Sequence, residues 1–332
     1  MLSKGVVRRN PFKIGRLPWI VRLYLWATKG GVGTGVKLGI FFLFQRFWPW
    51  RLVGKFYLND EEITYDATNT QFGSLYNPGT EKGYELELMA LLDVVMDKKG
   101  VLYDVGCNWG YFSVFAASKK NFEGSVYAFE PYPSTFDNLK EVVSQTRNGS
   151  KITCLEVGLS NEEGQREMRY QGLLDSGFAY LGSTPAKKSA LNVLSPRRHV
   201  RMARLDSMNL EPPTIIKIDA QFHEKEVLEG ATKTLSTYKP LIVFENCLVF
   251  ENPEMTWGPL KVLENLGYRL FFPCWTTKYG EIPSEADRGN FTSDRLALVP
   301  VSPKDRFLYR DMINILACHE SKISDLESKF RS

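Results

Sequence analysis

A glycine-containing segment marks the first candidate ligand-binding site of the chain. Residues 104–113 read D-V-G-C-N-W-G-Y-F-S, and Gly106 and Gly110 lie where a short apolar run passes into a helical pattern. Glycine permits a tight turn and close approach of a ligand to the backbone. The free N–H groups at the start of a helix favour negatively charged or polar groups. The pattern therefore predicts a small-molecule site at the carboxyl end of a strand, with a purely structural turn as the alternative.

An acidic residue downstream narrows the class of ligand. Glu130 lies twenty residues after Gly110, directly behind a second apolar run at 125–129. A carboxylate in this place can accept hydrogen bonds from both hydroxyls of a ribose. The glycines follow G-x-x-x-G spacing rather than the G-x-G-x-x-G of dinucleotide-binding proteins, so a dehydrogenase that uses NAD or FAD is disfavoured. S-adenosylmethionine, which has a ribose and an adenine but no phosphate, fits the pattern better.

The elements around these motifs alternate between strand and helix patterns. Apolar runs typical of buried strands occur at 101–105, 125–129, 152–157, 214–219, 241–245, 268–272 and 296–299. Helical spacing of apolar residues occurs at 84–96, 111–119, 134–144, 224–236 and 257–266. Ser134 and Asp137 are expected to form a capping box at the start of the third of these helices. This order predicts a doubly wound α/β fold with a mostly parallel sheet of seven strands and helices on both faces.

Charge divides the chain into a basic arm and an acidic remainder. Residues 1–59 contain eleven Lys or Arg and no Asp or Glu, whereas the other 273 residues carry 31 basic and 38 acidic side chains, a balance of −7. We predict three regions: a basic, aromatic N-terminal extension over 1–80 with short helices at 18–27 and 36–47, a catalytic domain over 81–303, and a C-terminal helix with a charged tail over 304–332. A hydrophobic content of 43% excludes disorder of the whole chain.

Three interpretations of the basic arm are open. Basic and aromatic side chains are typical of a peripheral contact with an anionic membrane. The second interpretation is that the arm forms a helical layer packed on the catalytic domain or on a dimer partner. Contact with nucleic acid is the least favoured interpretation, because no recognised RNA-binding module is present, and we expect no nucleic-acid partner.

The location expected for the protein is cytoplasmic, with membrane association as an alternative. The longest apolar run of the arm, 38–44, is too short to span a bilayer and lies too deep in the chain for a signal peptide. Five cysteines without paired spacing exclude a disulfide scaffold.

Several segments, in the same order, resemble the motifs of one enzyme family. Residues 104–113 resemble the D-V-G-A-N-x-G-x-F-S motif of FkbM-type S-adenosylmethionine-dependent methyltransferases, and residues 128–133 are similar to the A-F-E-P-x-P motif of that family. Residues 157–164, 205–208 and 216–231 resemble its A-L-S…G, L-D-x-L and K-I-D-x-E-G-x-E-x-x-V-L-x-G-A motifs. The resemblance covers about residues 80–250 and implies a Rossmann-like class I methyltransferase fold.

The resemblance also implies the cofactor, S-adenosyl-L-methionine, and the residues around it. The residues expected to surround its methionine part are Asp104, Gly106, Asn108 and Gly110. Glu130 would hold the ribose, and Val157 and Gly158 would border the adenine. Glu85, in a Tyr-Glu pair that the family often carries, is a further candidate for cofactor binding, with a solvated charge on a helix face as the alternative.

The segment after the fourth predicted strand departs from the family pattern. The family continues D-V-E-G-A-E, whereas residues 219–224 read D-A-Q-F-H-E, so that Gln221 and Phe222 replace a glutamate and a glycine. Methyl transfer to a hydroxyl needs an aligned acceptor oxygen and a group that takes the hydroxyl proton. We expect either His223 or Asp219 to take the proton while the other orients it. For His223 the alternative is a surface residue at the start of a helix.

Glu245, at the end of the fifth predicted strand, is a third catalytic candidate, with a structural ion pair as the alternative. No metal ion is expected, because the three histidines are scattered and no cysteine pair has ligand spacing. Oxygen ligands for Mg²⁺ from Asp219, Glu224 and Glu245 are the less favoured alternative.

A basic stretch without helix or strand pattern, 171–204, is expected to be a loop over the site. Its substrate-binding candidates are Lys187, Arg197 and Arg198. Such a loop can close over an anionic acceptor, or it can simply be solvated. FkbM-type enzymes act mostly on hydroxyls of sugars, so the resemblance implies an O-methyltransferase whose acceptor is a sugar, glycan or glycolipid. The alternatives are a methyltransferase of a lipid or small metabolite, and a binding module that has lost activity through Gln221 and Phe222.

Overall fold

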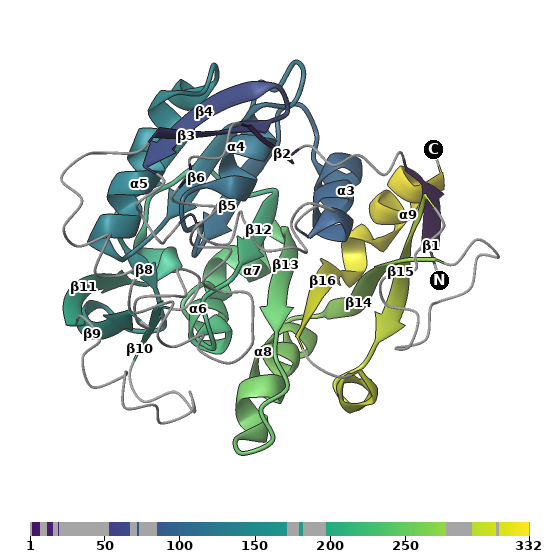
Figure 1. Ribbon diagram of the computed structural model, residues 1–332. Helices are drawn as coiled ribbons and strands as arrows, with labels where there is room; N and C mark the ends of the chain where they lie inside the picture. Colours follow the sequence, from purple (N-terminus) through teal and green to yellow (C-terminus); the bar gives the residue numbers. More distant parts are fainter. Residues whose placement is uncertain are drawn as a thin grey trace, which may run out of the picture.

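The computed structural model describes residues 2–6, 12–15, 19, 53–66, 72, 85–170, 179–181, 197–276, 294–309 and 312–331. In these residues a central sheet carries helices on both faces, and two smaller sheets lie against it (Figure 1). Apart from Trp19, the predicted helices at 18–27 and 36–47 lie outside the described residues, as does Lys187.

The central sheet has nine strands in the order β1-β15-β14-β16-β13-β12-β5-β6-β7. Its parallel half consists of β7 (Ile152–Leu155), β6 (Ser125–Phe129), β5 (Val101–Val105), β12 (Ile215–Ile218) and β13 (Leu241–Asn246). The other half consists of β16 (Ile313–His319), β14 (Tyr268–Trp275), β15 (Arg295–Val301) and β1 (Leu2–Gly5), which pair antiparallel. The doubly wound α/β fold is confirmed, and the sheet is wider than the seven strands predicted.

Two strands of this sheet, β1 and β16, are not predicted by the sequence. β16 is a buried apolar run inserted between β13 and β14, where a C-terminal helix and tail are expected. A short apolar run does not distinguish a buried strand from a buried helix, so its partners must be known. The expected C-terminal helix follows as α9 (Ile323–Arg331).

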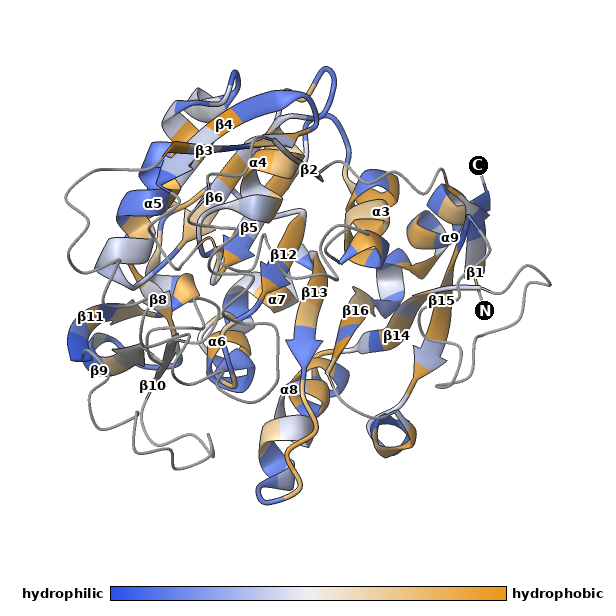
Figure 2. Ribbon diagram, in the orientation of Figure 1, coloured by the Kyte–Doolittle hydropathy of each residue, from blue (hydrophilic) through white to orange (hydrophobic). Residues whose placement is uncertain are grey.

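Helices cover both faces of the sheet, as the continuous burial of the central strands β5 and β12 requires. One layer holds α3 (Leu86–Val95), α4 (Tyr111–Ala117), α5 (Pro133–Ser144) and α9. The opposite layer holds α6 (Glu224–Glu229), α7 (Thr232–Tyr238) and α8 (Pro253–Asn265). In β5, Leu102 packs with the first layer and Tyr103 with the second. Figure 2 shows that the strands between the two layers are largely hydrophobic.

Two local predictions are corrected. The predicted capping box of Ser134 and Asp137 is wrong, since no side chain forms a cap hydrogen bond at the start of α5. The helix begins one residue earlier, at Pro133, because the fixed φ of proline suits the first helical position. The predicted helix at 224–236 is divided into α6 and α7 around Gly230. A Cβ on Gly230 would lie 1.9 Å from the backbone oxygen of Ser160, so this close contact requires glycine.

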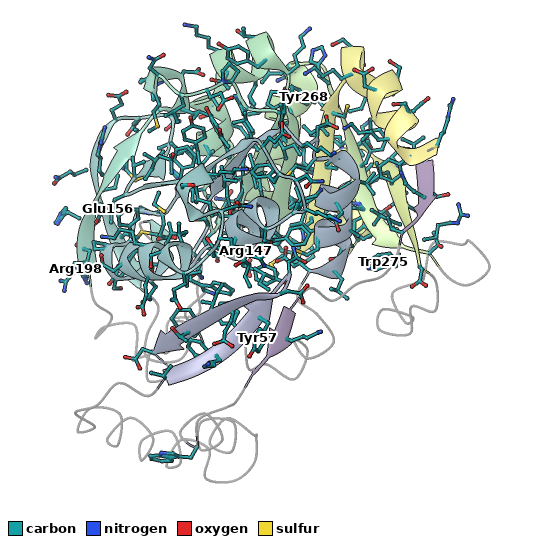
Figure 3. The ribbon with its side chains drawn as sticks, turned by 90° about the horizontal axis from the view of Figure 1, so that it is seen from above. Tyr57, Arg147, Glu156, Arg198, Tyr268 and Trp275 are labelled. Carbon is teal, nitrogen blue, oxygen red and sulfur yellow. The ribbon has the colours of Figure 1, made fainter. Side chains whose placement is uncertain are left out.

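Apart from Trp19, whose backbone is helical, the described segments of the basic arm contain strands. β1 extends the central sheet, and β2 (Phe12–Ile14) joins β3 (Val53–Leu58) and β4 (Glu61–Asp66) in a three-stranded sheet. This sheet packs on the α4–α5 layer: the side-chain amide of Gln145 bonds both the N–H and the C=O of Thr64, at 2.8 and 2.9 Å. Figure 3 shows the small sheet, with Tyr57, at the outer side of that layer. Membrane contact by the rest of the arm stays a prediction.

A second small sheet forms beyond β7. Its strands are β10 (Ala179–Leu181), β9 (Gly164–Tyr170), β11 (Arg197–Ala203) and β8 (Gly158–Leu159). The expected loop over 171–204 is therefore wrong for residues 179–181 and 197–203, which pair with β9 as the strands β10 and β11. No helix among the described residues is long and apolar enough to cross a membrane.

Candidate active site

Three candidate residues lie at one edge of the central sheet because their strands are parallel neighbours. Gly106 follows β5, Asp219 follows β12, and Glu245 is near the end of β13. The register pairs Val105 with Ile218 and Ile218 with Phe244, so the three strand ends are aligned. Gly106 has φ 70°, and a Cβ there would lie 1.9 Å from the backbone oxygen of Asp219. Only glycine fits between these strand ends.

The glycine turn is fastened to the neighbouring strand β6. The N–H groups of Gly106 and Cys107 both donate to the backbone oxygen of Phe129, at 3.0 and 3.1 Å. Gly110, with φ 94°, ends the turn, and α4 begins at the next residue. The turn thus lies directly beside Glu130, the residue after Phe129.

The carboxylate of Glu130 is held in place by the backbone. Its Oε2 accepts from the N–H of Asn108 at 3.1 Å, and its Oε1 accepts from the N–H of Tyr132 at 2.9 Å. Burial raises the pKa of this carboxyl to about 7. A carboxylate offers about four acceptor positions, so each oxygen can still accept from a hydroxyl. This arrangement fits the two hydroxyls of a ribose.

A buried lysine lies behind the strand ends. The Nζ of Lys217, on β12, is 3.6 Å from Asp104 Oδ1 and 3.5 Å from Asp219 Oδ2, and it lies 4.9 Å from the ring centre of Phe112. Ser113 Oγ donates to Asp104 Oδ2 at 2.7 Å. Burial acts to lower the pKa of Lys217, but the charges of Asp219 and Asp104 outweigh it and raise the pKa above its usual value. Lys217 therefore holds a positive charge between two carboxylates.

Glu245 and Glu85 bring further negative charge to this edge. Burial, followed by the charges of Asp219 and Glu85, raises the pKa of Glu245 to about 9. Glu85 precedes α3 with φ 44°, and its Oε2 accepts from Asn314 Nδ2 at 3.4 Å. Asn314 is the residue of β16 that pairs with Glu245, so both glutamates belong to one site.

The charge balance of this edge fits a cation. Four carboxyl groups, Asp104, Asp219, Glu245 and Glu85, surround one lysine, so carboxyl groups outnumber the positive charge even though burial raises the pKa of Glu245 and keeps it protonated near neutral pH. S-adenosylmethionine carries a positive sulfonium next to its ribose. The chain offers carboxylates for the cation and Glu130 for the ribose, so the residues fit this cofactor.

His223 and Asp219 have different partners. His223 Nε2 is 3.0 Å from Ser160 Oγ, and its Nδ1 is 3.4 Å from Glu226 Oε2. Burial lowers the pKa of His223. Asp219 Oδ1 instead accepts from Gln221 Nε2 at 2.8 Å. Among the described residues no hydrogen bond joins His223 to Asp219, so the side chains that orient Asp219 are Gln221 and Lys217.

Glu224 fixes the turn between Asp219 and α6. Its side chain is buried, and its Oε1 accepts from the N–H of Ala220 at 3.0 Å. Burial raises its pKa to about 7, although hydrogen bonds from the backbone of the turn act to lower it. Its contacts make it a structural support of the Asp219 turn.

The remaining candidates lie toward the second small sheet. Val157 is buried, and Gly158 pairs with Met202 of β11, whose sulfur would lie 2.7 Å from a Cβ at Gly158. Arg197 and Arg198 are exposed on β11, and Arg197 forms a 3.6 Å ion pair with Glu167. Figure 3 shows Arg198 at the periphery of the molecule.

Sequence reasoning missed Lys217 and Asn314 as members of the site. A lysine inside the otherwise apolar strand I-I-K-I is the signal that points to Lys217, because an unpaired charge is rarely buried. Asn314 has no such signal, since β16 itself is not predicted.

Comparisons with known proteins agree with the motifs. A model of the methyltransferase FkbM domain matches residues 99–270, just over half of the chain. The chain is 29% identical over 159 residues to the hexuronic acid methyltransferase AglP of Haloferax volcanii, a match that covers 48% of this chain and 61% of that relative's length.

Several solved structures with similarity to the chain are methyltransferases, and two of them serve as examples. One is methyltransferase FkbM from Methylobacillus flagellatus KT, with 15% identity, a TM-score of 0.35, and coverage of 53% of this chain and 44% of that one. Another is an O-methyltransferase from Bacillus cereus in complex with SAH, with 14% identity, a TM-score of 0.37, and coverage of 70% of this chain and 80% of that one.

Proposed function

The chain belongs to the FkbM methyltransferase family, and we propose that it transfers a methyl group to a hydroxyl of a sugar, glycan or glycolipid. Its cofactor is S-adenosylmethionine. The observation that carries the proposal is the ionic arrangement of Asp219, which lies at the sheet edge shared with the glycine turn and is held by Lys217 and Gln221. The similarity to a hexuronic acid methyltransferase supports the sugar acceptor.

The bound cofactor supplies an electrophilic methyl carbon on its sulfonium. Glu130 binds the ribose through the two oxygens that Asn108 and Tyr132 hold in place. The carboxylates of Glu85 and Asp104 provide a negative environment for the sulfonium. These residues therefore bind and orient the donor rather than react with it.

Asp219 takes the proton in the proposed reaction. The bound cofactor would supply the methyl group to the acceptor oxygen, and the hydroxyl proton would pass to the Asp219 carboxylate. Gln221 donates to Oδ1 at 2.8 Å, and Lys217 Nζ lies 3.5 Å from Oδ2, so the carboxylate is held in one orientation for the proton transfer. Glu245, with a pKa of about 9 in the cofactor-free chain, is a neutral hydrogen-bond donor near neutral pH and can hold the acceptor oxygen.

The test is methyl transfer to a panel of saccharides that contains hexuronic acids, followed by product mass spectrometry. We expect the product to gain one methyl group with the wild-type chain. Asp219→Asn should bind S-adenosylhomocysteine but transfer methyl at least about 100-fold more slowly, the lower end of the range for a general base. His223→Ala tests the other candidate, and unchanged turnover removes His223 from the mechanism. Cofactor binding without transfer to any saccharide, lipid or small metabolite would identify a binding module instead.

A further inference from the structure

The turn after Asp219 has an unusual backbone. Gln221 and Phe222 have φ angles of 50° and 73°, so two consecutive residues with long side chains occupy the left-handed region. This conformation costs about 1–2 kcal/mol for a residue that has a Cβ, and it is uncommon for bulky residues. Glycine adopts it freely. The family pattern carries glycine where this chain has Phe222, so the backbone alone does not call for a phenylalanine.

The surroundings hold this turn in place. The N–H of Asp219 donates to the backbone oxygen of Val105 at 2.9 Å, and the N–H of His223 donates to that of Ala220 at 3.2 Å. Glu224 adds a hydrogen bond to the N–H of Ala220. Strained backbone persists where neighbours determine it in this way, and such sites cluster where ligands bind.

The ring of Phe222 is not used to build the hydrophobic core. Residues 215–218 of β12 are fully buried, whereas Phe222 is partly exposed. Among the described residues, Phe222 belongs to none of the clusters of buried hydrophobic side chains and contacts no other aromatic ring. Since this phenylalanine neither relaxes the backbone nor fills the core, we expect its ring to contact a ligand at the surface of the site.

We propose that Phe222 is a specificity-determining residue, which places its ring against the apolar face of the sugar acceptor. The inference rests on the proposed function. Phe222 lies close to Asp219 because the two residues belong to the same turn and are three residues apart. Gln221, which precedes Phe222 in the strained part of this turn, donates a hydrogen bond to the Asp219 carboxylate. One face of a pyranose presents C–H groups, which pack on the electron-rich face of an aromatic ring. The same turn thus binds the sugar ring through Phe222 and places the Asp219 carboxylate near the hydroxyl that is methylated.

The matched variants are Phe222→Gly and Phe222→Tyr. Phe222→Gly removes the ring and suits the left-handed backbone, so the urea midpoint of unfolding should stay the same or rise. Its KM for the saccharide that the wild type methylates should rise at least about tenfold, while its affinity for S-adenosylhomocysteine, measured by calorimetry, stays within about twofold. Phe222→Tyr keeps an aromatic face and should retain a KM close to that of the wild type.

The outcomes separate this inference from the proposed function. A Phe222→Gly variant with the KM of the wild type overturns the role of the ring and leaves the proposed function standing. A lower urea midpoint for Phe222→Gly shows that the ring supports the fold, and it also overturns the inference. Absence of transfer by the wild type to every saccharide overturns both.

Discussion

Replacing Lys217 with methionine removes a positive charge that lies between the carboxylates of Asp104 and Asp219 at the edge of the sheet where the candidate site lies. The side chain of Lys217 is 6% exposed, and that of Asp104 is fully buried. Methionine has a similar length and keeps the apolar stem of the lysine. The substitution therefore tests the charge more than the packing.

The expected loss of stability follows from the geometry. At the observed distances of 3.6 and 3.5 Å, and at an effective dielectric constant of about 20, each ion pair has a Coulomb energy of about 5 kcal/mol. The cost of burying the charges offsets much of this energy. Breaking a buried pair by removal of one partner typically destabilises a protein by about 3–5 kcal/mol. We expect Lys217→Met to lower the free energy of unfolding at pH 7 by this amount.

Urea unfolding followed by circular dichroism measures the effect. Adding Asp104→Asn to Lys217→Met should restore part of the stability, because it removes a buried charge that has lost its partner. The loss caused by Lys217→Met should be smaller at pH 5, where the unpaired carboxyls take up protons more easily. Lys55→Met is the matched control, since Lys55 forms an exposed ion pair with Glu62 and should contribute little. Equal stability of wild type and Lys217→Met, or further destabilisation by Asp104→Asn, would refute the reasoning.

Two further predictions concern the carboxyl groups of the site. Glu130→Ala should weaken the binding of S-adenosylhomocysteine about 10- to 150-fold, because a hydrogen bond to a charged group contributes about 1.5–3 kcal/mol. Calorimetry measures this affinity, and Asp137→Ala, at an exposed carboxylate, is the control. Equal affinities of wild type and Glu130→Ala would remove Glu130 from the cofactor site. The cofactor-free protein should lose stability as pH rises from about 5 to 9, because the raised pKa values of Glu130, Glu224 and Glu245, about 7, 7 and 9, make the folded chain hold more protons than the unfolded chain. Most of the loss from Glu130 and Glu224 should occur by about pH 7, and that from Glu245 should continue to about pH 9. Urea unfolding across this range should show a weaker decline for Glu245→Gln, and a stability that rises with pH in the wild type would contradict the prediction.

The sequence by itself determined the local elements of the central fold and the class of the cofactor. The glycine turn and Glu130 are local signals: glycine is required where Gly106 approaches Asp219, and a carboxylate directly after a strand lies at the ligand-binding edge of a parallel sheet. Alternating apolar runs and helical patterns similarly report which residues are buried, whatever their partners are.

Only the tertiary structure decided which side chains act together. Lys217 lies between Asp104 and Asp219 because β5 and β12 are neighbours, and those strands are more than a hundred residues apart in the chain. One partner of His223, Ser160, likewise comes from a distant segment. β16 is recognised as a strand through its pairing with β13 and β14. The spacing of apolar residues along the sequence indicates which side chains are buried. Ion pairs and strand order depend instead on contacts between distant segments, and no local sequence pattern contains that information.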